Sequence, residues 1–563
     1  MKFSEMPYTR PDLDVLRRAA ETAVAALDSA TSAQAQLEAY RAYETAAATA
    51  QTMCSLCEIR HTIDTRDPFY EAEQDYLDEV SPQMEELDQQ VSRALLRSPF
   101  RAELSEALGK LLFTNLEIQV RSFDPVLLPL MQEENKLTSA YQKLYASAMV
   151  EFDGQTIPLP KLGPYKESPD RAVRRAAYET EGRFFDAHRE ELDDLFDKLV
   201  KNRTQQARLL GHDNYLQLGY DRLGRNCYGP KDVEAFRDQI AQDMVPIVAR
   251  VKADQAKRLG LGGLKLYDDP MLFPDGNAKP FGTPDEILAA GRAMYEALSP
   301  ETAEFGRFLF DNELLDVLSK DGKAPGGYCT DLPDYQAPFI FSNFNGTSGD
   351  VDVLTHEAGH AFEGYLAARD DAIPEDLKCP SMESAEIHSM AMEFLTAPWH
   401  GLLFGADTPK YALTHAEESL IFLSYGCEVD EFQHIMYQHP NLTADQRNDV
   451  WLRLEQKYRP WIDFDGLPFY GRGAGWQRQL HIYELPFYYI DYCLSTMAAL
   501  QFFLLGEADH ADAWQRYLKL CRKGGTASYT ELCATAGLRT PFEEGSVKAI
   551  AGPVADWIAA HQV

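Results

Sequence analysis

Apolar residues recur at three- and four-residue spacing over most of the first 120 positions of the chain. The stretches "LDVLRRAAETAVAAL" and "MEELDQQVSRALL" combine this spacing with helix-forming residues, which is the pattern of an amphipathic helix. We therefore expect long helices packed on each other from Asp12 to about Ser122. Helical patterning returns in "PDRAVRRAAYETEGRFFDAHREELDDLFDKLVKNR", where Ser168, Pro169 and Asp170 form a start signal.

Three stretches depart from the helical pattern. In "MVEFDGQTIPL", Asp153 and Gly154 predict a tight turn between two short strands. The β-branched and aromatic residues of "PFIFSNF", which starts at Pro338, predict a strand that we expect at a sheet edge. Gly and Pro cluster from Leu259 to Glu286, and we expect an irregular connector on the surface there.

Composition and charge narrow the classes of protein. At 563 residues with 45% hydrophobic positions, the chain exceeds the size at which a single hydrophobic core keeps growing. The formal net charge of −34 repels phosphate backbones and anionic lipids, so we expect neither nucleic acid nor a membrane as a partner. The start lacks an apolar signal region, and we find no uninterrupted apolar span of about 18 residues. We expect a soluble, cytoplasmic protein.

The nine cysteines are scattered from Cys54 to Cys533, which indicates reduced thiols rather than a disulfide framework. Cys54, Cys57 and His61 resemble half a zinc knuckle. No second cysteine pair follows at a suitable distance, so we expect no metal there.

The stretch "LTHEAGHAFEGY" carries the strongest chemical signal. Because residues four apart share a helix face, His356 and His360 can present two imidazole nitrogens to one ion, with Glu357 beside them. This is the HExxH pattern of zinc hydrolases. The alternative is a solvated patch of His and Glu side chains on an ordinary helix.

A catalytic zinc ion also needs a third protein ligand. The later segment "SMESAEIHSMAMEFL" supplies Glu383 and Glu386 on another expected helix, and spacing alone does not choose between them. We take Glu386 as the third ligand, and Glu393, seven residues later on the same face, can orient a ligand or nearby backbone from the outer shell. His388 points about two residues round the helix, and we expect a structural role for it.

Three motifs, in order, resemble those of the zinc oligopeptidases of the oligoendopeptidase F and thimet oligopeptidase family (peptidase family M3), on the branch that includes Pz-peptidases. They are "PFIFSNFNGTSGDVDVLTHEAGHAF", "AEIHSMAMEFL" and "WQRQLHIYELPFYYIDY". The resemblance implies a mainly α-helical, two-lobed zincin-type metallopeptidase with a small β-sheet beside the active-site helix and a deep central channel. We expect a helical lobe over residues 1–200 and a catalytic lobe over residues 201–563.

The resemblance also implies roles for individual residues. The family pattern of a ligand Glu followed seven residues later by another Glu matches Glu386 and Glu393. In the family a His and a Tyr on a glycine-rich loop and the following helix face the zinc, and His481 and Tyr492 match best. Tyr489 is an alternative catalytic hydroxyl and Tyr488 a substrate-binding one. The segment "PFYYIDY" taken alone favours an aromatic helix in the hydrophobic core, because aromatic side chains mostly pack there.

Together these features predict a zinc-dependent endopeptidase that cuts internal bonds of short peptides. One zinc ion per chain would be held by His356, His360 and Glu386, with Glu357 as the general base. We expect the strand "PFIFSNF" to align the substrate as an added strand. Two other classes remain: a zinc hydrolase of non-peptide amides, and a silent peptide-binding scaffold, against which the presence of Glu357 argues. The oligomeric state is open.

We predict that cleavage is limited to short peptides, because the resemblance is to channel-type peptidases that exclude folded chains. Mass spectrometry should show cleavage of a defined mixture of short peptides, while gel electrophoresis shows intact casein. Rapid degradation of casein without prior trimming would contradict this expectation.

Overall fold

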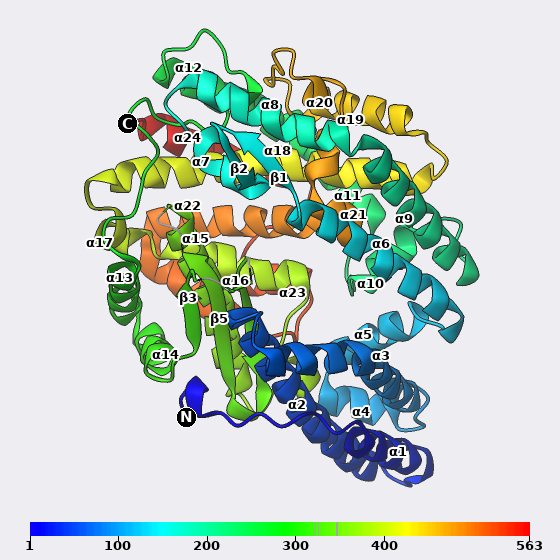
Figure 1. The fold of residues 1–563 in the computed structure, drawn as a ribbon. Coiled ribbons are helices and arrows are strands. Elements are labelled where there is room, and N and C mark those ends of the chain that lie inside the picture. Colours follow the sequence, from blue (N-terminus) through cyan, green and yellow to red (C-terminus); the bar gives the residue numbers. More distant parts are fainter. Residues whose placement is uncertain (321, 325, 345–346) are drawn as a thin grey trace. The chain divides into compact units, whose positions relative to one another are not determined.

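The computed structural model describes residues 1–563 except Asp321, Pro325, Asn345 and Gly346 (Figure 1). Asn345 and Gly346 belong to the motif "PFIFSNFNGTSGDVDVLTHEAGHAF", and this part of the motif lies outside the described residues. The chain is mainly helical and carries one two-stranded and one three-stranded sheet in its described parts. The expected fold class is therefore confirmed at the level of a mainly α fold with a small sheet.

The chain forms two compact units. Unit 1 comprises residues 1–121, 279–408 and 501–539, and unit 2 comprises residues 122–278, 409–500 and 540–563. We expected a single division near residue 200, but that position lies inside helix α9 (Arg189–Leu209) of unit 2, and each unit contains segments from both sides of it. Helix α22 (Tyr489–Cys521) continues from unit 2 into unit 1, so no linker composition marks this crossing.

Unit 1 begins with the helices that the spacing of apolar residues predicts. They are α1 (Leu13–Ser29), α2 (Ala33–Ile63), α3 (Pro68–Leu96), α4 (Arg101–Leu108) and α5 (Lys110–Arg121). Asp12 caps α1 by accepting hydrogen bonds from two backbone N–H groups of its first turn. Buried residues such as Leu16, Leu95 and Leu112 join these helices in one hydrophobic core, so the expectation of packed helices up to about Ser122 is confirmed.

The rest of unit 1 contains further helices and the three-stranded sheet. The helices are α13 (Pro284–Leu298), α14 (Pro300–Asp311), α15 (Gly349–Ala368), α16 (Met382–Leu395), α17 (Gly401–Phe404) and α23 (Tyr529–Ala536). The strands are β3 (Leu315–Leu318), β4 (Tyr328–Leu332) and β5 (Ala337–Phe344).

The motif strand "PFIFSNF" is not at a sheet edge, and our expectation was wrong. The strand order is β3-β5-β4, so β5 pairs with β3 in parallel and with β4 antiparallel. Nearly every residue of β5 is buried, as the apolar run over its first five residues requires of a strand covered on both faces. The edge positions belong to β3 and β4, each of which has β5 as its one strand partner in the described part of the chain.

Helix α15 packs on β5 on one side and on α16 on another (Figure 1). The approach to α16 is closest at Gly359, where an added Cβ would lie 2.5 Å from the carbonyl oxygen of His388 and 2.6 Å from Cα of Ser389. The same carbonyl accepts a hydrogen bond of 2.8 Å from the hydroxyl of Tyr517. Glycine at this position therefore sets the spacing of the two helices.

Unit 2 contains a hairpin and twelve α-helices besides the first part of α22, counted over the described residues. They are α6 (Leu128–Ala146), α7 (Gly163–Lys166), α8 (Arg171–Ala187), α9, α10 (Leu216–Arg222), α11 (Pro230–Gln239), α12 (Val245–Arg258), α18 (Thr408–Gln438), α19 (Ala444–Tyr458), α20 (Pro468–Gly471), α21 (Leu480–Glu484) and α24 (Ser546–Ala560). Helix α18 belongs to unit 2 from its second residue, Pro409, onward. Helices α7 and α20 are single turns. Asp170 caps α8, as its start signal predicts.

The hairpin of unit 2 is confirmed. Strands β1 (Met149–Phe152) and β2 (Gln155–Pro158) pair antiparallel, and both turn residues, Asp153 and Gly154, have positive φ. The connector after Leu259 is irregular as expected, but Leu272 and Phe273 within it are each 2% exposed. Part of this connector is therefore buried in unit 2 rather than lying on its surface.

Among the described residues, one helix, α22, is long and apolar enough to cross a membrane by length and composition alone. Of its most apolar window, 67% is buried inside the protein. The mostly buried core helices of soluble proteins meet the same criteria, so this helix is weak evidence for a membrane span.

We predict that Gly359→Ala destabilises the protein by about 1–3 kcal/mol, because the methyl group overpacks the contact between α15 and α16. The thermal midpoint measured by circular dichroism should fall by several degrees. Gly506→Ala in α22 is the matched control, since its Cβ would meet only one methyl carbon at 3.9 Å. Equal midpoints for both variants would refute the assigned role of Gly359.

Candidate metal and catalytic site

Helices α15 and α16 bring three side chains together in unit 1. His356 and His360 lie one turn apart on α15, with ring centroids 5.0 Å from each other. Oε2 of Glu386, on α16, lies 3.2 Å from Nε2 of His356 and 3.6 Å from Nε2 of His360. One ligand atom from each residue lies within 4.8 Å of the others, so two nitrogens and one oxygen converge as a tetrahedral metal site requires.

Glu393 orients one of these imidazoles. Its Oε1 lies 2.7 Å from Nδ1 of His356, and this bond leaves Nε2 of the same ring directed at Glu386. Burial opposes a positive charge on His356, but its hydrogen bonds to Glu386 and Glu393 hold its pKa well above the usual value. A carboxylate behind the imidazole is the usual outer-shell partner of a metal-binding histidine.

The two competing residues of α16 lie outside this group. Glu383 is fully buried and accepts a hydrogen bond of 2.9 Å from the hydroxyl of Ser381. The His388 ring is also fully buried, and burial lowers its pKa to about 3, so it is neutral. Spacing in the sequence did not choose between Glu383 and Glu386. In the structure, Glu386 is the carboxylate that lies close to both histidines.

Glu357 lies on α15 next to His356 and is 8% exposed. Burial raises the pKa of its carboxyl group, and the two neighbouring imidazoles act against this rise. A carboxyl group in this setting can take up a proton and release it again.

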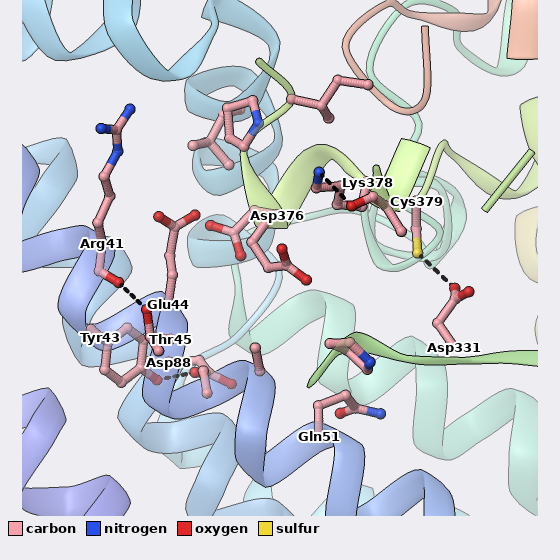
Figure 2. A pocket seen from close by; sticks show the side chains of 18 of the residues that line it. Arg41, Tyr43, Glu44, Thr45, Gln51, Asp88, Asp331, Asp376, Lys378 and Cys379 are labelled. Atoms are coloured by element: carbon pink, nitrogen blue, oxygen red, sulfur yellow. Dashed lines mark hydrogen bonds between the residues drawn. The ribbon is translucent and has the colours of Figure 1, made fainter. Parts of the chain in front are cut away.

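Sequence reasoning missed a large cavity in unit 1, shown in Figure 2. Its volume is about 1320 Å³, and the edge strand β4 contributes residues 329–332 to its lining. Carboxylates from distant parts of the chain also line it, among them Glu44, Asp88, Asp331 and Asp376. The residues come from separate helices and a strand, so the only sequence signal was the excess of acidic residues.

The residues of the third motif gather in unit 2. His481 lies on α21, Tyr488 directly precedes α22, and Tyr489 and Tyr492 lie in its first turn. The His481 ring centroid lies 5.8, 5.1 and 6.1 Å from those of Tyr488, Tyr489 and Tyr492, respectively. The structure thus brings all four candidate residues of this motif into one cluster.

A hydrogen-bond chain sets the tautomer of His481. The hydroxyl of Tyr425 donates to Oε1 of Gln479 at 2.8 Å, and the amide nitrogen of Gln479 lies 2.8 Å from Nδ1 of His481. The amide N–H therefore donates to Nδ1, which leaves the proton of the neutral ring on Nε2. Burial lowers the pKa of His481, so the ring is a neutral hydrogen-bond donor at pH 7.

Comparison with known proteins identifies the family of this chain. The model described as "Peptidase M3 N-terminal domain" matches residues 3–123, and "Peptidase family M3" matches residues 164–273 and 301–552. The chain is similar to a solved structure of PZ peptidase A with an inhibitor, at 45% identity and a TM-score of 0.93 over 99% of each chain. It shares its fold with oligoendopeptidase F from Enterococcus faecium, at 16% identity and a TM-score of 0.63 over 98% of this chain and 97% of that one.

A curated relative extends this picture. The chromosomal oligoendopeptidase F of Lactococcus lactis subsp. cremoris is 24% identical over 404 residues, which are 69% of this chain and 64% of that protein. The match thus spans a little less than two thirds of that relative's length. The M3 models cover most of this chain, and the matched region includes the HExxH helix, α16 and the His481 cluster. The chain is therefore a peptidase of family M3, related to oligoendopeptidase F.

Proposed function

We propose that this protein is a zinc-dependent oligoendopeptidase that hydrolyses internal bonds of short peptides. The observation that carries the proposal is the convergence of His356, His360 and Glu386 next to Glu357. The membership of family M3 supports peptides as the substrate class. The net charge of −34 argues against nucleic acid as a partner, and we propose a cytoplasmic location.

The three converging residues fit a zinc ion. Two imidazole nitrogens and one carboxylate oxygen form the donor set of many catalytic zinc sites, and Glu393 supplies the outer-shell partner. His356, His360 and Glu386 would hold one ion per chain. When bound, zinc polarises the scissile carbonyl and acidifies a water molecule.

Glu357 serves as the general base in this proposal. Its carboxylate takes a proton from the attacking water and passes it to the leaving amine, which balances the hydrolysis of the amide. Its place next to His356 on one helix turn keeps the carboxylate beside the ligands. A buried setting also limits competing proton exchange with bulk water.

The family resemblance assigns to the His481 cluster hydrogen bonds to the developing oxyanion. Nε2–H of His481 and the hydroxyl of Tyr492 are the donors we propose, with Tyr489 as the alternative hydroxyl and Tyr488 as a substrate contact. The tautomer set by Gln479 supports His481 in this role. Loss of one such donor typically costs about 10²- to 10³-fold in rate.

The substrate backbone cannot add to β5, which is paired on both sides. The sheet offers the outer edges of β3 and β4, and of these two strands β4 lines the large cavity. An extended peptide bound there would make main-chain hydrogen bonds that do not depend on its sequence. This arrangement favours a peptide over a small amide as substrate, and a screen of quenched peptides against small amides tests the choice.

We predict that the purified protein binds one zinc ion per chain and that two substitutions separate binding from turnover. Glu357→Gln should keep the metal and lose at least about 10³-fold in kcat, because the amide cannot accept the proton. Glu386→Ala should lose metal affinity, because it removes one of three ligands. Elemental analysis and peptide kinetics on both variants check this. A protein without transition metal and with activity insensitive to chelators would exclude a zinc enzyme.

We predict that Tyr492→Phe lowers kcat far more than it raises KM, because a hydroxyl that bonds the oxyanion acts in the transition state. Tyr488→Phe and Tyr489→Phe should be measured beside it. If Tyr492→Phe keeps the normal kcat and Tyr489→Phe lowers it, the oxyanion donor is Tyr489 rather than Tyr492. Normal rates in all three variants would eliminate the tyrosine from the mechanism.

A further inference from the structure

The turn between α21 and α22 contains an unusual backbone conformation. The N–H of Tyr488 bonds the carbonyl of Leu485 at 3.3 Å, which closes a four-residue turn with Pro486 and Phe487 in its centre. Phe487 has a φ of +71°. A type II turn requires positive φ at this third residue and normally has Gly or Asn there. A phenylalanine in this place is sterically disfavoured.

The ring of Phe487 explains why the position is not a glycine. It is fully buried and contacts the rings of Tyr220, His434 and Tyr437, with centroids 5.6, 4.9 and 5.4 Å away. It also lies against Gly219 of α10, where an added Cβ would come within 2.6 Å of two ring carbons. The absence of a side chain at Gly219 therefore creates the space that the ring fills.

Both backbone polar groups of Phe487 are bound by buried side chains. Its N–H donates to Oε1 of Gln433 at 3.0 Å, and its carbonyl accepts a hydrogen bond from Nη2 of Arg225. The same nitrogen of Arg225 lies 2.7 Å from Oδ1 of Asp491, in the first turn of α22. Arg225 and Asp491 are both fully buried on their side chains, so the turn is tied directly to the helix that follows it.

The turn separates His481 from the tyrosines of the third motif. A change of φ at Phe487 would rotate α22 relative to α21 and separate the rings of His481, Tyr489 and Tyr492. We propose that Phe487, held in its left-handed conformation by Arg225 and by the space at Gly219, is a positioning residue. It fixes the two donors of the oxyanion, and this inference rests on the function proposed above.

Gly219→Ala tests the inference without touching the donors. The methyl group would displace the Phe487 ring, so we expect kcat to fall by about 10-fold or more with KM within about 2-fold, as for a loss felt in the transition state. Gly552→Ala in α24 is the matched control, because nothing lies within 4 Å of its Cβ position. It should leave both constants unchanged.

A double-substitution cycle separates positioning from general destabilisation. If Gly219 acts through the donor cluster, the fold-loss in kcat from Gly219→Ala should be smaller in Tyr492→Phe than in the unaltered protein, because coupled residues are not additive. Fully multiplied losses would overturn the inference. If Gly219→Ala does not fold, Phe487→Gly takes its place, since glycine keeps the positive φ and removes the ring.

A spectroscopic measurement decides the question even if the protein cleaves no peptide. In the protein with ¹³C-labelled histidine, the ring proton of His481 is identified by its loss in His481→Gln. The stacked ring of Tyr488 and the edge-on rings of Tyr489 and Tyr492 shift this resonance. In Gly219→Ala it should move toward the free imidazole value, while Gly552→Ala leaves it in place. An unchanged resonance in Gly219→Ala would overturn the inference, whereas absent peptide cleavage by the unaltered protein would overturn the proposed function.

Discussion

The contact between α15 and α16 at Gly359 is the constraint on which the candidate metal site depends. Because Gly359 has no Cβ, the backbone of α16 approaches to the position that a methyl group would occupy. This closeness brings Glu386 to both histidines and Glu393 to the far side of one imidazole. Ala358 and Gly359 are the two variable positions of the HExxH stretch and carry no reactive group, yet Gly359 sets the spacing of the two helices.

The surroundings of this contact are buried and already paired. The His388 carbonyl that faces Gly359 accepts a hydrogen bond from Tyr517, and β5 supports the opposite side of α15. A rigid support of this kind holds ligands in place before a metal binds, which reduces the ordering cost of binding. The helix pair and sheet therefore form one preorganised element.

Unit 2 uses a different device for the same purpose. A fully buried phenylalanine holds a strained turn, and an arginine ties the carbonyl of that turn to the next helix. The strain is compatible with a stable fold because ring burial and hydrogen bonds to Gln433 and Arg225 outweigh it. Both units thus place their polar residues by means of a glycine: Gly359 admits the backbone of α16, and Gly219 admits the ring of Phe487.

Local patterns in the sequence predict the helices of residues 12–122, the hairpin at Asp153-Gly154 and the grouping of His356, Glu357 and His360 on one helix. These features follow from local periodicity, turn residues and the four-residue spacing of a helix face. Spacing did not choose between Glu383 and Glu386, because that choice depends on how α16 packs against α15. The central place of β5, the two units with their repeated crossings and the acidic cavity were decided by the tertiary structure alone. Each of them depends on pairing or packing between segments far apart in the chain, which no local pattern encodes.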